Sequence, residues 1–143
     1  MSPYIDTSAL AKWYLNEARS QDFEAFIRGQ RGALISRLTV IELRCLLARR
    51  RRAGELSEAL ERRAFATFEN DLAQGSLDLR PLHDGQAILA LELLSALRRH
   101  ALSMIDALHL AVARDAAATA IASADRVMIA AAESLGFEVV RFD

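Results

Sequence analysis

The sequence predicts an α/β fold in which helices cover both faces of a central parallel sheet. Short apolar runs alternate with longer segments of helical periodicity along all 143 residues. No repeat, linker or low-complexity segment interrupts this alternation, and the length suits one continuous core. Because parallel strands joined by helices need right-handed crossovers, we expect a single three-layer α/β/α domain over residues 1–143, with about five strands.

Two strands and four helices are expected in the first half of the chain. The apolar run at 4–6 is typical of a short buried strand, and Thr7 or Ser8 is the expected cap of the next helix. Large apolar residues at i, i+3, i+4 spacing mark a second helix, and glycines end the later ones. The expected elements are a strand at 4–6, helices at 8–15 and 20–30, a strand at 33–36, and helices at 39–53 and 55–73.

The second half continues the alternation with three strands and three helices. The run at 77–82 alternates apolar and polar residues and ends near Pro81, which is typical of an edge strand. Gly136 is the expected C-cap of the last helix. The expected elements are a strand at 77–82, helices at 84–99 and 103–114, a strand at 117–123, a helix at 125–135 and a strand at 138–142.

The composition favours a globular protein of the reducing cytoplasm. Hydrophobic residues make up 52% and the net charge is -1, so nucleic-acid binding would need a local basic patch. Cys45 is the only cysteine, which excludes an intramolecular disulfide and fits a reducing compartment. The first residues lack the pattern of a signal peptide, and no uncharged run reaches the roughly 18 residues of a membrane span. We therefore expect a cytoplasmic protein without membrane association.

Four carboxylates, Asp6, Glu42, Asp106 and Asp125, lie where the chain changes between strand and helix. In an α/β sheet, the loops after the strands gather at one edge, and a crevice opens where the strand order reverses. That reversal occurs here if the first and fourth strands are neighbours. Two carboxylates 4 Å apart repel by roughly 4 kcal/mol at an effective dielectric of 20. Four oxygen ligands in one crevice therefore indicate a hard divalent cation.

Helix capping is the structural alternative for three of these acids. Glu42 follows Thr39, and Asp106 follows Ser103, at the spacing of a capping box. Asp125 could itself cap the last helix. Asp6 differs, because it ends an apolar strand, where aspartate is disfavoured. Asp106 also opens a helix that is apolar nearly all round, and a carboxylate buried there needs a compensating partner.

Five short motifs that include the four acids in order follow one another along the chain. They are Tyr4-Ile-Asp-Thr-Ser8, Glu42 near a helix start, Asp106-Ala-Leu-His-Leu-Ala111, Ser123-Ala-Asp-Arg126 with Ala130-Ala131, and Gly136-Phe-Glu-Val-Val140. Together they resemble, from end to end, the PIN-domain ribonucleases, and most of all the VapC-type toxins of bacterial toxin–antitoxin pairs. The fourth motif usually has threonine where this chain has Ser123, which keeps the hydroxyl.

The resemblance implies a Mg²⁺- or Mn²⁺-dependent endoribonuclease whose metal activates a water against an RNA phosphodiester. It also implies an RNA substrate, a cognate antitoxin and a homodimer. The implied catalytic residues are Asp6, Glu42, Asp106 and Asp125; the metal ligands are Asp6, Asp106 and Asp125; and the residues that orient the carboxylates are Thr7, Ser8 and Ser123. Whether Glu42 or Asp125 deprotonates the water stays open.

Other functions fit the sequence less well. A phosphoacceptor receiver domain needs a lysine after a late strand, whereas Lys12, the only lysine, lies in the first helix. A phosphatase with two aspartates spaced by one residue is excluded because position 8 is serine. No glycine-rich phosphate loop with lysine is present. The remaining alternative is a catalytically inactive PIN-like module that binds protein or RNA.

Two further features allow both a structural and a functional interpretation. The run Arg49–Arg52 ends a helix, where cations are favoured, and it could also contact RNA phosphates or an acidic partner. His109 shares a helix face with Asp106, yet a packed core histidine is the simpler interpretation.

Overall fold

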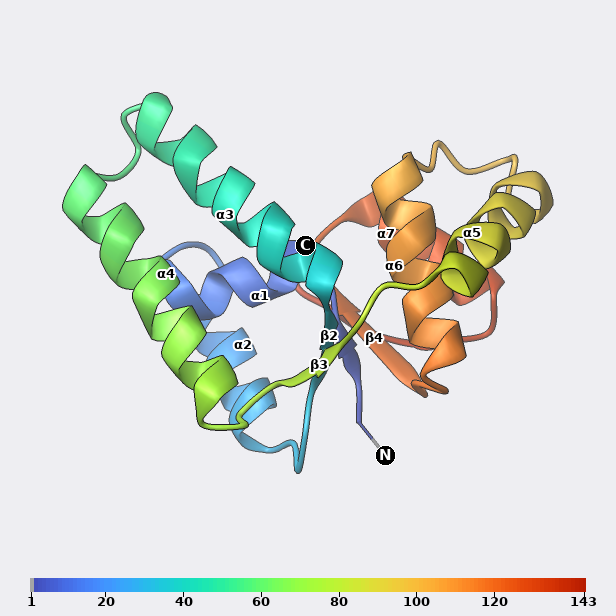
Figure 1. The fold of residues 1–143 in the computed structure, drawn as a ribbon, viewed down its shortest axis with the longest axis horizontal. Coiled ribbons are helices and arrows are strands. Elements are labelled where there is room, and N and C mark those ends of the chain that lie inside the picture. The colour runs from blue at the N-terminus through green and yellow to red at the C-terminus, as the bar shows by residue number, and fades with distance from the viewer. Residues whose placement is uncertain (1) are drawn as a thin grey trace.

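A five-stranded, all-parallel sheet forms the centre of the molecule (Figure 1). The computed structural model describes residues 2–143. The strands are β1 (Tyr4–Ile5), β2 (Leu34–Ser36), β3 (Asp78–Arg80), β4 (Ala120–Ser123) and β5 (Glu138–Arg141). Their order in the sheet is β3-β2-β1-β4-β5, so β3 is an edge strand, as predicted, and the order reverses between β1 and β4.

Seven helices cover the two faces of the sheet, four on one side and three on the other (Figure 1). The first group is α1 (Thr7–Tyr14), α2 (Ser20–Arg28), α3 (Arg37–Arg52) and α4 (Glu58–Ala73). The second group is α5 (Asp84–Ala96), α6 (Met104–Asp115) and α7 (Arg126–Ser134). The three-layer α/β/α arrangement predicted from the sequence is therefore confirmed. Within residues 2–143, none of the helices combines the length and the apolar character that crossing a membrane requires.

Successive strand residues point to opposite faces and build two separate cores. Ile5 and Ile35 belong to the core under α1 to α4, whereas Tyr4 and Leu34 belong to the core under α5 to α7. Both faces are covered, so the central strands β1, β2 and β4 are buried on both sides, whereas the edge strands β3 and β5 carry exposed charged residues.

The structure corrects two predicted helix caps. α1 begins at Thr7, and Asp6 is its N-cap, so neither Thr7 nor Ser8 caps it. α3 begins at Arg37, directly after β2, and the capping box forms one turn earlier than predicted. Thr39 Oγ1 accepts a hydrogen bond from the backbone N–H of Ser36 at 3.3 Å. Glu42 therefore lies inside α3 and does not cap it.

Smaller differences concern where elements begin and end. β4 begins at Ala120 rather than 117, because Ala117 has a φ of 54°, which no strand residue adopts. The C-cap of α7 is Leu135, and Gly136 follows it with a φ of 85°, the left-handed conformation that glycine adopts without strain.

Candidate active site

The candidate site lies at the reversal of strand order between β1 and β4. The backbone N–H of Asp6 continues the pairing of these strands by donating to the carbonyl oxygen of Ala122 at 2.9 Å. Beyond this point the chain leaves β1 into α1 and β4 into α7. The condition on which the predicted crevice depended, that β1 and β4 are neighbours, is met.

All four predicted acids line one cavity of about 330 Å³ at this reversal. Asp6 comes from the end of β1, Glu42 from α3, Asp106 from the first turn of α6, and Asp125 from the start of α7. The other residues that line the cavity are Thr7, Ser8, Leu38, Ile41, Cys45, Leu46, Arg49 and Ile105. The cavity thus has a carboxylate-rich end and an apolar wall along α3.

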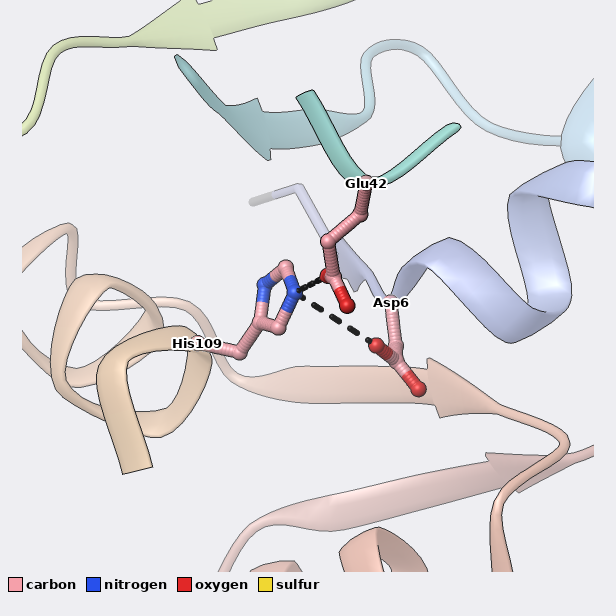
Figure 2. Close-up of side chains that lie close together, drawn as sticks. All are labelled: Asp6, Glu42 and His109. Atoms are coloured by element: carbon pink, nitrogen blue, oxygen red, sulfur yellow. Dashed lines mark hydrogen bonds and ion pairs between the residues drawn. The ribbon is translucent and has the colours of Figure 1, made fainter. Parts of the chain in front are cut away.

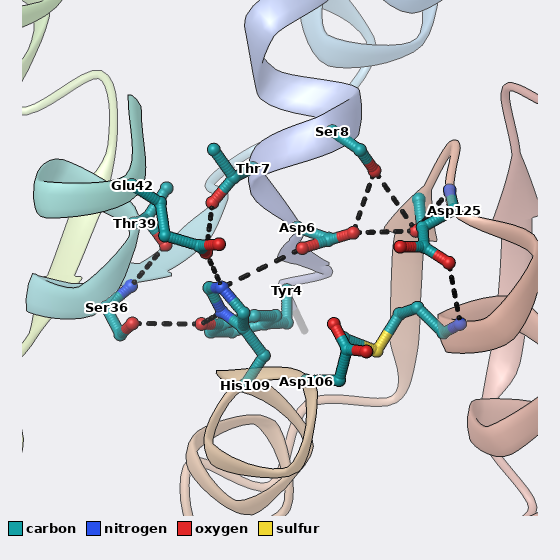
Figure 3. Close-up of polar contacts among 12 residues, drawn as sticks. Tyr4, Asp6, Thr7, Ser8, Ser36, Thr39, Glu42, Asp106, His109 and Asp125 are labelled. Atoms are coloured by element: carbon teal, nitrogen blue, oxygen red, sulfur yellow. Dashed lines mark hydrogen bonds and ion pairs between the residues drawn. The ribbon is translucent and has the colours of Figure 1, made fainter. Parts of the chain in front are cut away.

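The Asp6 carboxylate is buried and held by two serine hydroxyls (Figure 3). Ser8 Oγ and Ser123 Oγ each donate to Asp6 Oδ2 at 2.8 Å. Ser123 also accepts a hydrogen bond from the backbone N–H of Asp125 at 3.0 Å. Both hydroxyls bind Oδ2, whereas Oδ1 accepts no hydrogen bond within residues 2–143 and lies 3.8 Å from His109 Nε2.

Glu42 is held by two side chains, Thr7 and His109 (Figure 3), and Figure 2 shows the contact with His109. Thr7 Oγ1 donates to Glu42 Oε1 at 2.8 Å, so Thr7 orients Glu42 rather than Asp6. His109 Nε2 is hydrogen-bonded to the same oxygen and lies 3.8 Å from Asp6 Oδ1. One ligand atom each from Asp6, Glu42 and His109 lies within 4.8 Å of the other two.

Behind the carboxylates, Tyr4, Ser36 and His109 form a buried hydrogen-bonded chain (Figure 3). The Tyr4 hydroxyl is 2.6 Å from His109 Nδ1 and 3.0 Å from Ser36 Oγ. His109 is therefore both a packed core histidine and a neighbour of the carboxylates in the site. Tyr4 and Ser36 were not predicted. The period of two along β1, which puts Tyr4 and Asp6 on one face, is the signal that pointed to Tyr4.

The charges of the site change the pKa values of its groups. Burial lowers the pKa of His109, but the hydrogen bond to Glu42 and the charges of Asp6 and Glu42 outweigh it, and the net pKa is raised. Burial raises the pKa of Glu42, but its bonds to His109 and Thr7 outweigh that effect and lower it. Glu42 therefore favours the protonated form of His109, and His109 favours the ionised form of Glu42.

Asp106 and Asp125 both cap helices, as the structural alternative predicted. Ser103 and Asp106 form a capping box: the Asp106 N–H donates to Ser103 Oγ at 3.1 Å, and Asp106 Oδ2 accepts from the Ser103 N–H at 3.2 Å. Asp125 Oδ1 accepts from the backbone N–H groups of Val127 and Met128 at 2.8 and 3.2 Å. Both side chains also line the cavity, so capping does not remove them from the site.

The residues fit a divalent cation by their chemistry, because the donors are mostly carboxylate oxygens. Burial raises the pKa of Asp106, and the charges of Asp125 and Asp6 raise it further, which is the repulsion that a cation would relieve. Among residues 2–143, the group within 4.8 Å comprises Asp6, Glu42 and His109. The predicted ligand set of Asp6, Asp106 and Asp125 shares only Asp6 with this group, and it stays a prediction.

Comparison with known proteins agrees with this fold. The sequence profile of the PIN domain matches residues 4–134. No curated protein sequence matches the chain. Several solved structures do, and at their low sequence identities the similarity shows the fold alone.

Three of these structures cover nearly the whole chain. VapC20 of Mycobacterium tuberculosis, described as a sarcin–ricin loop cleaving toxin, is 20% identical, with 98% of this chain and 99% of that chain covered and a TM-score of 0.76. DNA-bound VapBC of Salmonella typhimurium is 18% identical, with 100% of both chains covered and a TM-score of 0.70. VapBC2 of Rickettsia felis, bound to a promoter DNA fragment, is 14% identical, with 100% of both chains covered and a TM-score of 0.67.

Proposed function

The chain belongs to the PIN domain family, and from that premise we propose that it is a metal-dependent endoribonuclease, the toxin of a toxin–antitoxin pair. The observation that carries the proposal is the convergence of Asp6, Glu42, Asp106 and Asp125 on one cavity at the reversal of strand order. An inactive binding module would have no need to hold four carboxylates together against their mutual repulsion.

Asp6, Asp106 and Asp125 are the proposed ligands of Mg²⁺ or Mn²⁺, in part through water molecules. When bound, such an ion supplies an acidified water and neutralises charge on the phosphate. Asp6 offers Oδ1, because Ser8 and Ser123 occupy Oδ2 and fix the orientation of the carboxylate.

The proton of the attacking water goes to a carboxylate oxygen that has no other partner. Thr7 and His109 both bind Glu42 Oε1, and within residues 2–143 Oε2 accepts no hydrogen bond. The capping bonds of Asp125 likewise occupy Oδ1 and leave Oδ2 free. Glu42 Oε2 and Asp125 Oδ2 are therefore the two candidate proton acceptors.

The proposed partners are an RNA substrate, a cognate antitoxin and a second copy of this chain. VapBC and a toxin–antitoxin complex are among the proteins that share the fold, which supports the antitoxin. Exposed apolar side chains support a protein interface: Ile88 is 56%, Leu91 67% and Met104 70% exposed. A single cysteine and an RNA substrate fit the cytoplasm as the site of action.

Substitution of Asp6 by asparagine tests the proposal. With Mn²⁺, the purified wild-type protein is expected to cleave single-stranded RNA, and EDTA is expected to stop the cleavage. Asp6→Asn should reduce cleavage by a factor of at least about 100, as removal of a group that stabilises transition-state charge does. Asp22→Asn, a matched change of an exposed carboxylate in α2, should leave cleavage unchanged. Full cleavage by Asp6→Asn, with its circular dichroism intact, refutes the assignment.

A further inference from the structure

Arg49 is the only basic residue among the described residues that line the acidic cavity. It follows Glu42 by about two turns of α3, so the two side chains share nearly one helix face and lie roughly 10 Å apart along the axis. Ile41, Cys45 and Leu46 line the cavity along the same helix. The cavity therefore runs along α3 from the carboxylates to a cation.

Two of the other three arginines at the end of α3, Arg50 and Arg51, form salt bridges away from the cavity. Arg50 binds Glu17 at 2.8 Å and Glu55 at 3.4 Å, and Arg51 binds Glu61 at 2.9 Å. Within residues 2–143, Arg49 and Arg52 form no salt bridge, and Arg52 does not line the cavity. Of the four-arginine run, Arg49 alone faces the site with its guanidinium unpaired.

Arg49 also forms no salt bridge with any of the acids beside which it lies. Its charge helps to lower the pKa of Glu42 without direct contact, while the hydrogen bonds to Glu42 and Asp6 come from His109, Thr7 and serine hydroxyls. The N–H donors of the Arg49 guanidinium are therefore left for another ligand. A guanidinium kept free at the rim of a cavity is suited to an anion from outside, and its planar fork matches the oxygens of a phosphate.

We propose that Arg49 binds a phosphate of the substrate strand that flanks the scissile phosphate, so that the RNA follows α3 across the cavity. This inference rests on the proposed function, because the carboxylate end fixes where the scissile phosphate lies. The nucleotide between the two phosphates then packs against the apolar wall at Ile41, which is 54% exposed. Arg49 thereby sets the direction in which the strand enters the site.

Binding of a short, labelled single-stranded RNA of mixed sequence tests this, measured by fluorescence anisotropy in EDTA over a salt series. Arg49→Ala is expected to bind about tenfold more weakly than the wild type, as loss of one charge-assisted contact does. Its salt slope should fall by about 0.7, the value for one phosphate on a single strand. Arg49→Lys should retain part of the affinity. Arg52→Ala, the matched unpaired arginine outside the cavity, should bind like the wild type.

Two further readouts separate this site from the catalytic centre. With Mn²⁺, Arg49→Ala should raise KM about tenfold and leave kcat nearly unchanged, as loss of uniform binding does. Its stabilisation by Mn²⁺ in a thermal-shift measurement should equal that of the wild type, since the carboxylates are intact.

The contrary outcomes are equally distinct. Unchanged RNA binding by Arg49→Ala overturns the phosphate site, and so does an equal loss in Arg52→Ala, which would indicate bulk charge alone. Normal RNA binding by Arg49→Ala combined with weaker binding of a protein partner also overturns it. If RNA binding depends on Arg49 but the wild type cleaves no RNA with Mn²⁺, the nuclease proposal fails while the binding site stands.

Discussion

His109 contacts three residues that lie far from it in the chain, Tyr4, Asp6 and Glu42. Its Nε2 faces Glu42 and Asp6, and its Nδ1 is 2.6 Å from the Tyr4 hydroxyl. The imidazole is 1% exposed, so its orientation is fixed by these bonds and by the packing of α6. We infer that His109 positions the Glu42 carboxylate, much as an outer hydrogen-bond partner orients a ligand in a metal site.

The sequence could place His109 on the face of Asp106 but not identify its partners. Spacing along one helix follows from the sequence alone. The contact between Tyr4 and His109 joins residues 105 positions apart and depends on how α6 packs against the sheet. The period of two along β1 places Tyr4 on the face of Asp6, but it does not predict a contact with α6, and no local pattern indicates Ser36.

Replacing Glu42 by glutamine should lower the pKa of His109. The substitution removes the Glu42 charge and weakens the hydrogen bond that raise this pKa, while the opposing effect of burial remains, so the pKa of His109 falls. An NMR titration of the imidazole C–H resonances measures the change. Glu17→Gln, a matched change in a glutamate bound to Lys12 and Arg50, is the control that should leave the pKa of His109 in place.

The same shift gives a pH dependence of stability with a definite sign. The pKa of His109 is raised in the folded state, so its contribution is complete below 6.5 and is lost as the pH rises through the folded value. The wild type should therefore be more stable than Glu42→Gln at low pH, and this difference in unfolding free energy should become smaller as the pH rises through the folded-state pKa of His109. A His109 pKa that is identical in both proteins would rule out the ion pair.

Three of the four acids lie at a strand end or a helix start, whereas Glu42 lies inside α3. Asp6 follows β1, and Asp106 and Asp125 sit at the starts of α6 and α7, as their sequence context predicts. The alternative that Glu42 belongs to a capping box is wrong, because β2 leads directly into α3 and Ser36 is both the strand end and the N-cap. Element boundaries of this kind depend on sheet pairing, and the local sequence does not determine them.

Asparagine and alanine at position 125 separate helix capping from cation binding. Asparagine caps a helix as well as aspartate does but carries no charge, whereas alanine does neither. Asp125→Asn should keep its unfolding free energy in EDTA and lose most of its stabilisation by Mn²⁺. Asp125→Ala should lose both, with about 1 kcal/mol less stability in urea denaturation. Full stabilisation of Asp125→Asn by Mn²⁺ would mean that Asp125 only caps α7.

On the scale of the whole molecule, the order of the strands creates the site. β1 and β4 are neighbours, and the helices that follow them leave on opposite faces of the sheet. The alternation of strands and helices was sufficient to predict the layers and to bring four distant acids to one edge. The sequence could not predict that Asp6, Glu42 and His109 form the tightest group, because side-chain distances depend on packing.

Calorimetric titration with Mn²⁺ tests the central claim that these carboxylates share a divalent cation. The wild type should bind Mn²⁺ with defined stoichiometry, and a concentration of 100 times Kd should stabilise it by about 2.7 kcal/mol. Asp6→Asn should lose this binding, while Asp22→Asn retains it. Absence of Mn²⁺ and Mg²⁺ binding by the wild type, or equal binding by Asp6→Asn, would contradict the account.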